Sequence, residues 1–486
     1  MSLSEREIQE IVRAVVSKVE TGTGSAGTGS ERSEVPVPAV SGNDGVFSRM
    51  SDAVEAAHEA QKRWIALPIE TRKRCIEAMR AMHVAKARDY AEMAVSETGL
   101  GRVEDKIQKN LVAATRTQGM EDIPHTVYSG DHGITLEEYV PYGVIGSITP
   151  TTNPTETIVN NAIMMVAAGN AVVFNAHPSA KRVSMTALSN LNKAIVAAGG
   201  PPNLLTGIPN PTIETGNEMM KHPKVAAITV TGGGGVVKAA LAAGKWAMTA
   251  GPGNPPVLVD DTANLDRAGR EVVRGASIDN CVICTAEKEC FVFDSVADDL
   301  KKSLRKHGGH ELNGHQTDQL CRKVLDGYQG ARGPNRLRPN KSCVGRDASV
   351  LAKMIDLTIP SDTRLLFAEV DSKDHPLVQT EQLMPFLPIV RVPDFEAGVA
   401  AALDAEHGYR HTAVIHSNDL DRITRYAKAM NCSILVANGP NFAGLGLDGE
   451  GPTAWTITTP TGEGCTTPRN FCRKRRFTVK DALRIY

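Results

Sequence analysis

A regular alternation of apolar, strand-like runs and helix-period segments begins at residue 142 and continues to residue 245. The helix-period segments occupy 155–168, 180–198, 213–221 and 236–245, and the runs between them are YGVIGSI, AVVF, LLTGI and VAAITV. Parallel strands joined by helices through right-handed crossovers form a doubly wound sheet, so this rhythm predicts an α/β fold. Ligands of such sheets bind at the carboxyl ends of the strands, where the connecting loops gather.

The loops that follow these strands carry many side chains able to bind a ligand. Residues 149–154 are TPTTNP, residues 175–179 are NAHPS, residues 207–211 are GIPNP and residues 231–235 are TGGGG. Glycines after a strand let a dinucleotide approach the backbone closely, because they carry no side chain. A purely structural glycine turn explains TGGGG equally well from its sequence alone.

A second α/β unit begins near Pro255, with the strand-like runs PPVLVD and CFVF around a helix-period segment at 265–276. Between the helix and CFVF lies NCVICTAEK, which places Cys281 and Cys284 in a C-x-x-C spacing. This pair lacks the second ligand pair of a zinc site and the strand-to-helix setting of a thioredoxin-type motif. We therefore predict no metal site, and the pair is either two buried structural cysteines or includes a reactive nucleophile.

The first 45 residues differ in pattern from the rest of the chain. Residues 1–20 stack apolar side chains on one helical face, and Ser4 and Glu7 have the spacing of a capping box, so an amphipathic helix is predicted. Residues 21–45 are rich in Gly, Ser and Thr and predict a flexible linker, whose formal GxGxxG lacks a flanking strand and helix. The helix either packs on its own domain or docks into an apolar groove of another protein.

Composition and charge exclude several classes of protein. The 54 basic and 55 acidic residues give a net charge of −1, which leaves no overall field for gripping nucleic acid or anionic lipid. No run approaches the ~18 apolar residues of a membrane span, and the start lacks a signal-peptide pattern. The nine cysteines are odd in number and scattered, unlike a disulfide framework. We expect a cytoplasmic protein with no nucleic-acid or membrane partner.

Four motifs in combination resemble the aldehyde dehydrogenase superfamily, and most closely the propionaldehyde dehydrogenases of bacterial microcompartments in its coenzyme A-acylating branch. The motifs are PTTNP at 150–154, CTAEK at 284–288, EQLMPFLP at 381–388 and EHGYRHTA at 406–413. The resemblance covers about residues 46–486. It implies a homo-oligomer, built from dimers, whose subunit has three parts. These are a Rossmann-like cofactor-binding domain over 46–254 with an arm strand near 134–141, an α/β catalytic domain over 255–450, and a C-terminal oligomerisation arm over 451–486 with strands from 454–480.

The resemblance also implies roles for individual residues. Cys284 matches the nucleophile that attacks the aldehyde carbon, and Asn153 matches the side-chain donor to the resulting oxyanion, alongside the N–H of Cys284. His411 is either a structural histidine or the group that positions or deprotonates the incoming thiol. Glu381 matches the glutamate that hydrogen-bonds the nicotinamide ribose. The other expected cofactor-binding positions are Thr149, Pro150, Thr151, Asn175, His177, Ser179, Gly207, Thr231, Gly232, Gly233 and Gly251.

Two departures from the family pattern indicate the branch. Thr249 stands where water-using relatives carry a glutamate base, so the acyl thioester should survive until coenzyme A attacks it. Asn175 stands where many relatives have a lysine that contacts the adenosine ribose, and the absence of Lys and Arg in 174–180 favours NAD over NADP. The basic residues at 469 and 473–476 are expected to form a solvated face or a subunit contact rather than a phosphate site.

The sequence therefore predicts a CoA-acylating aldehyde dehydrogenase that uses NAD and coenzyme A. Its expected substrate is a short-chain aldehyde, with propionaldehyde suggested by the resemblance and acetaldehyde also compatible. The two rivals are a non-acylating dehydrogenase that releases the acid and an inactive scaffold protein of the same fold. Residues 1–20 resemble the encapsulation peptides of microcompartment enzymes, so we expect them to bind a shell protein and place the enzyme in the microcompartment lumen.

Overall fold

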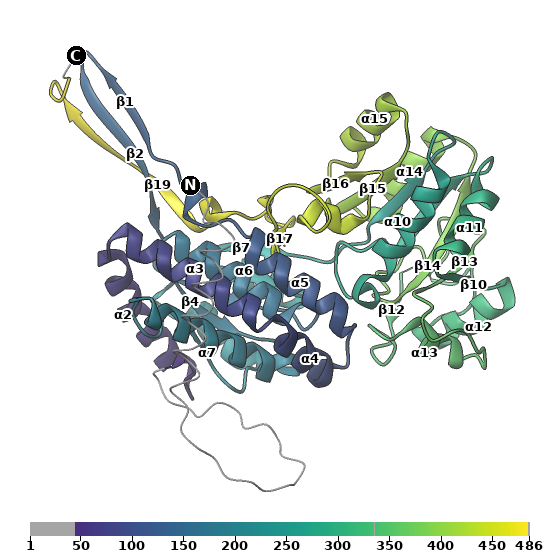
Figure 1. The fold of residues 1–486 in the computed structure, drawn as a ribbon, viewed down its shortest axis with the longest axis horizontal. Helices are drawn as coiled ribbons and strands as arrows, with labels where there is room; N and C mark the ends of the chain where they lie inside the picture. The colour runs from purple at the N-terminus through teal and green to yellow at the C-terminus, as the bar shows by residue number, and fades with distance from the viewer. Residues whose placement is uncertain (1–43, 335, 485–486) are drawn as a thin grey trace, which may run out of the picture. The chain divides into compact units, whose positions relative to one another are not determined.

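The structure, a computed structural model, describes residues 44–334 and 336–484, which form two compact units (Figure 1). The first unit comprises the described residues up to Glu97, together with Lys109–Ala250 and the chain from Pro452 onward. The second unit comprises Thr98–Gln108 and Gly251–Gly451. The predicted helix at 1–20 and the predicted linker up to residue 43 lie outside the described residues.

A five-stranded parallel sheet forms the centre of the first unit. Its order is β5 (Leu205–Gly207), β4 (Ala171–Asn175), β3 (Val144–Ile148), β6 (Val225–Thr231) and β7 (Trp246–Ala250). The chain runs outward from β3 to β5 and then returns to β6, so the strand order reverses between β3 and β6. The predicted strands and the α/β class are confirmed. The edge strand β7 was not predicted, because WAMTA lacks a run of β-branched residues.

Helices cover the first sheet in the doubly wound manner. Helix α6 (Pro154–Ala167) and helix α7 (Lys181–Ala197) cover β4 and β5 beneath an outer helix α3 (Ile69–Ala85), and every residue of α6 is buried. Helices α2 (Met50–Ala66) and α8 (Ile213–Lys221) pack together on β3 and β4, and α9 (Gly234–Leu241) packs on β6 and β7. Helix α4 (Ala87–Thr98) follows α3 along the chain. This layering fixes the loops at the strand ends.

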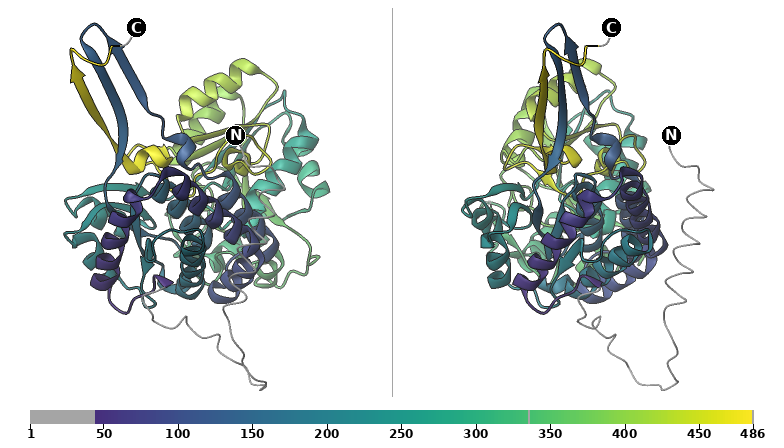
Figure 2. Two further views of the ribbon diagram at one scale, coloured as in Figure 1. Left: turned by 60° about the vertical axis from the view of Figure 1, so that its left-hand side comes forward. Right: turned by 90° about the vertical axis from the view of Figure 1, so that its left-hand side faces the viewer.

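A three-stranded antiparallel sheet projects from the helical layers of the first unit (Figure 2). It consists of β1 (Thr126–Gly130), β2 (Gly133–Pro141) and β19 (Cys472–Lys480), in that order. Two basic side chains of β19 are paired within the sheet, since Glu137 pairs with both Lys474 and Arg476. The earlier part of the expected C-terminal arm lies elsewhere: β17 (Ile457–Thr458) pairs with β18 (Gly464–Cys465) and packs against β7.

The second unit contains a seven-stranded, wholly parallel sheet. Its order is β10 (Gly309–Glu311), β13 (Leu365–Glu369), β14 (Phe386–Val392), β9 (Glu289–Phe293), β8 (Pro256–Val259), β15 (Thr412–His416) and β16 (Ile434–Ala437). Alternate residues of β8 enter two cores. Val257 and Val259 pack with α10 (Leu265–Ser277) and α11 (Ala297–Lys306). Leu258 packs with α14 (Phe395–Glu406) and α15 (Leu420–Met430), as the two-residue period of a strand requires.

Smaller elements complete the second unit beside β13 and β14. They are helix α12 (Gly314–Val324), helix α13 (Ala348–Lys353) and a two-stranded ribbon of β11 (Leu325–Asp326) with β12 (Arg338–Pro339). Their apolar side chains, with those of β13 and β14, form a third core cluster of this unit. The cluster supports β13 and β14.

The observed units differ from the contiguous domains expected from the sequence. Residues 251–254 belong to the second unit rather than the first, and the chain from Pro452 onward belongs to the first unit. Residues 98–108 pack with the second unit, because Asp105 and Lys106 at the start of α5 (Val103–Arg116) bond to Asp279. Asp44 and Gly45, expected to end the linker, instead pack in the first unit, where the Gly207 N–H donates to the Gly45 carbonyl at 3.0 Å.

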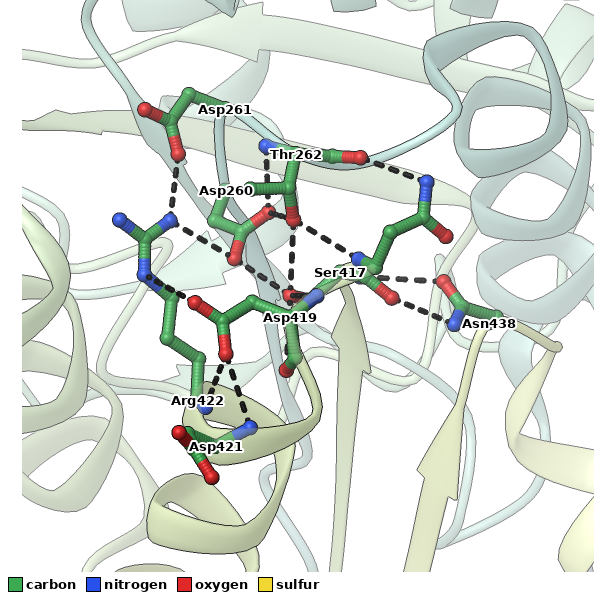
Figure 3. A network of polar contacts seen from close by, with 9 residues as sticks. Asp260, Asp261, Thr262, Ser417, Asp419, Asp421, Arg422 and Asn438 are labelled. Carbon is green, nitrogen blue, oxygen red and sulfur yellow. Dashed lines mark hydrogen bonds and ion pairs between the residues drawn. The ribbon is translucent and has the colours of Figure 1, made fainter.

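The carboxyl edge of the second sheet is closed by its own side chains at β8, β15 and β16 (Figure 3). The buried Asp260 carboxylate accepts hydrogen bonds from the Thr262 hydroxyl at 2.7 Å, the Ser417 hydroxyl at 2.6 Å and Arg422 at 3.1 Å. The Asn438 amide donates to the Ser417 carbonyl at 2.7 Å. This network fastens the three strand ends together.

Candidate active site

The expected cofactor-binding residues of the first unit share one edge of its sheet. Residues 149–151 follow β3, residues 175–179 include the end of β4 and its loop, Gly207 ends β5, and residues 231–233 include the end of β6 and its loop. Because these strands are parallel, their carboxyl ends lie along the same edge. The loops after β3 and β6 flank the point at which the strand order reverses, which is where doubly wound sheets bind nucleotides.

The loop after β6 is open enough to receive a dinucleotide phosphate. A Cβ atom added to Gly233, Gly234 or Gly235 would meet no heavy atom within 4 Å among the described residues. Helix α9 begins at Gly234, so its first backbone N–H groups and dipole are directed at this open loop. Near the other side of the reversal, the buried hydroxyls of Thr149 and Thr151 have no hydrogen-bond partner within the described chain. These residues fit NAD.

Other expected cofactor residues are already engaged within the first unit. The Asn175 amide donates to the Thr212 carbonyl at 3.3 Å, and its oxygen accepts from the Thr215 hydroxyl at 2.8 Å. Gly207 accepts a hydrogen bond from Phe47 as well as donating to Gly45. His177 and Ser179 are exposed and bonded to each other. Cofactor contacts by these four positions stay predictions.

Asn153 stands at the N-cap position of α6, but its side chain does not cap that helix. One amide hydrogen bond goes to the Thr152 hydroxyl at 3.2 Å, and the buried amide oxygen has no partner among the described residues. An asparagine before a proline often caps a turn, but this side chain makes no capping hydrogen bond to the helix that follows it.

In the second unit, Cys284 occupies a tight turn that precedes β9. The turn is closed by a hydrogen bond from the Ala286 N–H to the Ile283 carbonyl at 3.2 Å. Cys284 is partly exposed, whereas Cys281 is 1% exposed and its thiol lies 3.8 Å from the Glu287 carbonyl. Burial raises the pKa of the Cys281 thiol. Of the C-x-x-C pair, Cys284 is therefore the one suited to attack a substrate.

A left-handed segment holds this turn from the N-terminal side. Asp279, Asn280 and Cys281 have φ values of 49°, 53° and 65°, a conformation that costs roughly 1–2 kcal/mol per residue. The buried Asp279 carboxylate accepts from Arg102 N–H at 2.7 Å and from the buried Lys106 at 2.8 Å. Strain of this kind persists only where surrounding contacts over-determine it. Residues 98–108 supply those contacts.

Gly253 brings three expected site residues together. Its N–H donates to the Glu381 carboxylate at 3.2 Å. A Cβ atom added to it would lie 2.6 Å from the Cys284 carbonyl oxygen and 3.1 Å from the His411 ring. These residues precede the adjacent strands β14, β9, β8 and β15, so they lie at the amino edge of the second sheet.

Burial shifts the pKa values of two titratable side chains beside the Cys284 turn, His411 and Glu381. It lowers the pKa of His411 to about 3, with a smaller contribution from the positive charge of Lys288, so the imidazole is neutral. Its Nδ1 lies 2.9 Å from the Thr412 hydroxyl, and its buried Nε2 has no partner among the described residues. Burial also raises the pKa of Glu381 to about 7. A neutral imidazole with an unpartnered ring nitrogen can accept a hydrogen bond, but its low pKa makes it a weak base.

Two residues at this edge escaped the sequence reasoning. Gly253 stands in the run GPGNPP, where several glycines and prolines hide the one at which space is required. Lys288 is fully buried at the entry to β9. A charged residue directly before an apolar strand was the signal that could have marked it.

Two negative findings apply to residues 44–334 and 336–484. No three His, Cys, Asp or Glu side chains gather there in a way that could hold a metal ion. None of the helices in that part of the chain combines the length and apolarity of a membrane span.

Comparisons with a family profile, with curated sequences and with solved structures all find aldehyde dehydrogenases. The profile described as "Aldehyde dehydrogenase family" matches residues 43–318. The acetaldehyde dehydrogenase (acetylating) EutE of Salmonella typhimurium is 45% identical over 99% of this chain and 100% of its own. Two solved propionaldehyde dehydrogenases are each 43% identical, with a TM-score of 0.87 over 91% of this chain and 100% of theirs. One, from Rhodopseudomonas palustris, has bound CoA and an acylated cysteine; the other belongs to the fucose utilisation microcompartment of Clostridium phytofermentans.

Proposed function

This chain belongs to the aldehyde dehydrogenase family, and on that premise we propose that it converts a short-chain aldehyde, NAD and coenzyme A into acyl-coenzyme A and NADH. The observation that carries the proposal is the grouping of a partly exposed Cys284 and a buried, neutral His411 around Gly253. A nucleophile and a neutral hydrogen-bond acceptor at one edge suit the formation of a cysteine thioester followed by acyl transfer to a thiol. The acylating relatives support coenzyme A as the acceptor.

The first half of the reaction forms a thioester on Cys284. Its thiolate attacks the aldehyde carbon, and the C–S bond forms as the carbonyl π electrons move onto oxygen. The Cys284 N–H and the Asn153 amide are assigned to that oxygen, and one such donor in a dry site contributes about 3 kcal/mol of barrier lowering. NAD, when bound, accepts the hydride that leaves the tetrahedral carbon. The carbonyl then re-forms as the thioester.

The second half transfers the acyl group to coenzyme A. His411 Nε2 accepts a hydrogen bond from the incoming thiol and orients it. The thiol sulfur attacks the thioester carbonyl and gives up its proton, and Cys284 leaves as a thiolate that takes up a proton in exchange. Hydrolysis of the thioester would need a base to activate water. Thr249, at the position where water-using relatives carry a glutamate base, is fully buried and offers only a hydroxyl. Propionaldehyde and acetaldehyde are the substrates named for the relatives, and both fall within this proposal.

Product analysis with and without coenzyme A tests the proposed activity. Purified enzyme is incubated with propionaldehyde or acetaldehyde and NAD, and both NADH and acyl products are measured. We expect NADH formation that depends on coenzyme A and yields acyl-coenzyme A. Equal NADH formation without coenzyme A, with free acid as product, would establish the non-acylating rival. No NADH under any condition would establish the inactive scaffold.

We also propose that the enzyme works as a dimer-based homo-oligomer inside a bacterial microcompartment. The projecting β1–β2–β19 sheet is a suitable assembly element, and the Clostridium phytofermentans relative comes from a microcompartment. Residues 1–20 would bind a shell protein. Fusing residues 1–20 to a fluorescent protein and following its co-purification with shells tests this role, with the truncated enzyme assayed in parallel. A fusion that stays free of shells, with loss of activity on truncation, would assign the helix to the fold instead.

A further inference from the structure

Lys288 places a buried ammonium group beneath the turn that carries Cys284. The side chain is 0% exposed, and its Nζ donates to the Ala286 carbonyl at 2.7 Å and to the Ile283 carbonyl at 3.2 Å. These carbonyls lie on either side of Cys284 in the chain. The Lys288 backbone is held as well, because its N–H donates to Pro255 and its carbonyl accepts from Gln382.

The contact with Ile283 has a specific electronic consequence. The Ile283 carbonyl and the Cys284 N–H belong to the same peptide unit, which is planar and conjugated. The Lys288 ammonium, bonded to the Ile283 carbonyl oxygen, draws electron density through the peptide unit away from the Cys284 nitrogen. Hydrogen bonds in a chain polarise one another in this way. The same carbonyl also accepts from Ala286 N–H, so two donors converge on it. The Cys284 N–H thereby becomes a stronger donor.

We propose that Lys288 is a positioning residue that holds the Cys284 turn and polarises the Cys284 N–H toward the oxyanion of the reaction. Lys288 touches neither substrate nor cofactor in this proposal and acts through the turn. The role rests on the proposed function, because the oxyanion exists only if Cys284 is the nucleophile. The positive charge also favours the thiolate form of Cys284 over the thiol.

The surroundings of Lys288 concentrate the effect of its charge. The charge acts on Cys281, Glu287, Glu289, Glu381 and His411, which lie around the same turn. Burial keeps the pKa of the Glu289 carboxyl well above its usual range, which disfavours a negative charge beside Lys288. With water excluded from a fully buried ammonium, the field at the turn is screened little.

Substitutions that separate charge from hydrogen bonding test the proposal. Lys288→Met removes the charge and the hydrogen-bond donor but keeps a side chain of similar length. Lys288→Gln removes the charge and keeps a neutral donor. Cys290→Ala, a buried core position two residues further on, is the matched control for lost packing. For each full-length variant we measure the pH dependence of Cys284 alkylation by iodoacetamide without substrates, and kcat and KM with them.

The expected result differs between charge loss and simple destabilisation. Lys288→Met and Lys288→Gln should raise the apparent pKa of alkylation by about one unit and lower kcat at least tenfold, with the KM for coenzyme A little changed. Lys288→Gln should retain more activity than Lys288→Met. Cys290→Ala should lower the melting temperature while leaving the alkylation profile in place.

An unchanged alkylation profile together with kcat within about twofold of the unsubstituted enzyme would overturn the proposal. If a variant does not fold, Lys288→Arg, which keeps the charge with a different shape, supplies the comparison: a wild-type alkylation profile supports the role and a shifted one opposes it. Because alkylation needs no aldehyde, NAD or coenzyme A, this readout stands even if the proposed acylating activity fails.

Discussion

Replacing Gly253 by alanine tests whether the site depends on close packing at the amino edge of the second sheet. The added Cβ would lie 2.6 Å from the Cys284 carbonyl oxygen, about 0.8 Å short of the 3.4 Å at which ordinary contact begins. It would also lie 3.1 Å and 3.3 Å from two carbons of the His411 ring. The backbone of the Cys284 turn or the imidazole must therefore move.

The size of that displacement sets the expected effect on activity. Misplacing a catalytic group by ~1 Å can cost about 10²-fold in rate, which corresponds to about 2.7 kcal/mol of barrier. Overpacking a filled interior costs a further ~1–3 kcal/mol of folding free energy. We therefore expect Gly253→Ala to lose about two orders of magnitude in kcat and to melt several degrees lower.

The assay follows coenzyme A-dependent NADH formation at saturating substrates, with melting measured by differential scanning fluorimetry. Gly314→Ala is the matched control, because a Cβ at this first residue of α12 meets nothing within 4 Å in the described structure. The control should keep its activity and its melting temperature. If Gly253→Ala keeps kcat within about twofold with unchanged melting, the close approach of these groups does not govern catalysis.

Three further predictions concern the nucleophile, the acyl acceptor and pH. Cys284→Ala should abolish NADH formation and active-site labelling by iodoacetamide, while Cys281→Ala keeps substantial activity; full activity of the first variant would end the mechanism. Thr249→Glu should release acid without coenzyme A at least about tenfold faster than the parent, and a parent that already hydrolyses as fast as it acylates would contradict the assignment. Burial lowers the pKa of His83 from 6.5 to about 4, so its contribution to stability is complete above pH 6.5 and is lost as pH falls toward 4. His83→Gln should therefore reduce the loss of unfolding free energy between about pH 7.5 and 5 by about 2 kcal/mol, and equal pH slopes for both proteins would refute this.

The elements of the fold follow from local sequence where the pattern is strong. Val172, Val173 and Phe174 sit in a buried strand, and the apolar run that contains them already predicts one. Helix α10 was predicted within one residue of its end, because its apolar positions recur at the helical period. The edge strand β7 was missed, since Ala247 and Met248 carry no strong preference for a strand. Hydrogen bonds to the neighbouring strand β6 stabilise β7 although its residues have little strand propensity.

The candidate residues were found from motifs, but their arrangement was not. Cys284, Glu381 and His411 were each recognised by resemblance, and nothing in their motifs says that Gly253 lies against all three. The left-handed segment at 279–281 was likewise not predicted, because Asp and Asn tolerate this conformation but do not require it, and Cys does not favour it. Its conformation depends on Lys106 and Arg102 from another part of the sequence.

Sequence alone determined the α/β class and most of the strands and helices, because a hydrophobic period extends over a few neighbouring residues. It also singled out Cys284 as the candidate nucleophile, through a short motif. Tertiary structure alone decided which strand edge carries the site and which glycine must stay small. It also decided where the buried charge of Lys288 lies. Gly253 and Glu381 are 128 residues apart in the chain, and such contacts exist only after the parallel strands of the sheet have aligned. Side-chain packing at that edge then fixes distances that no local pattern encodes.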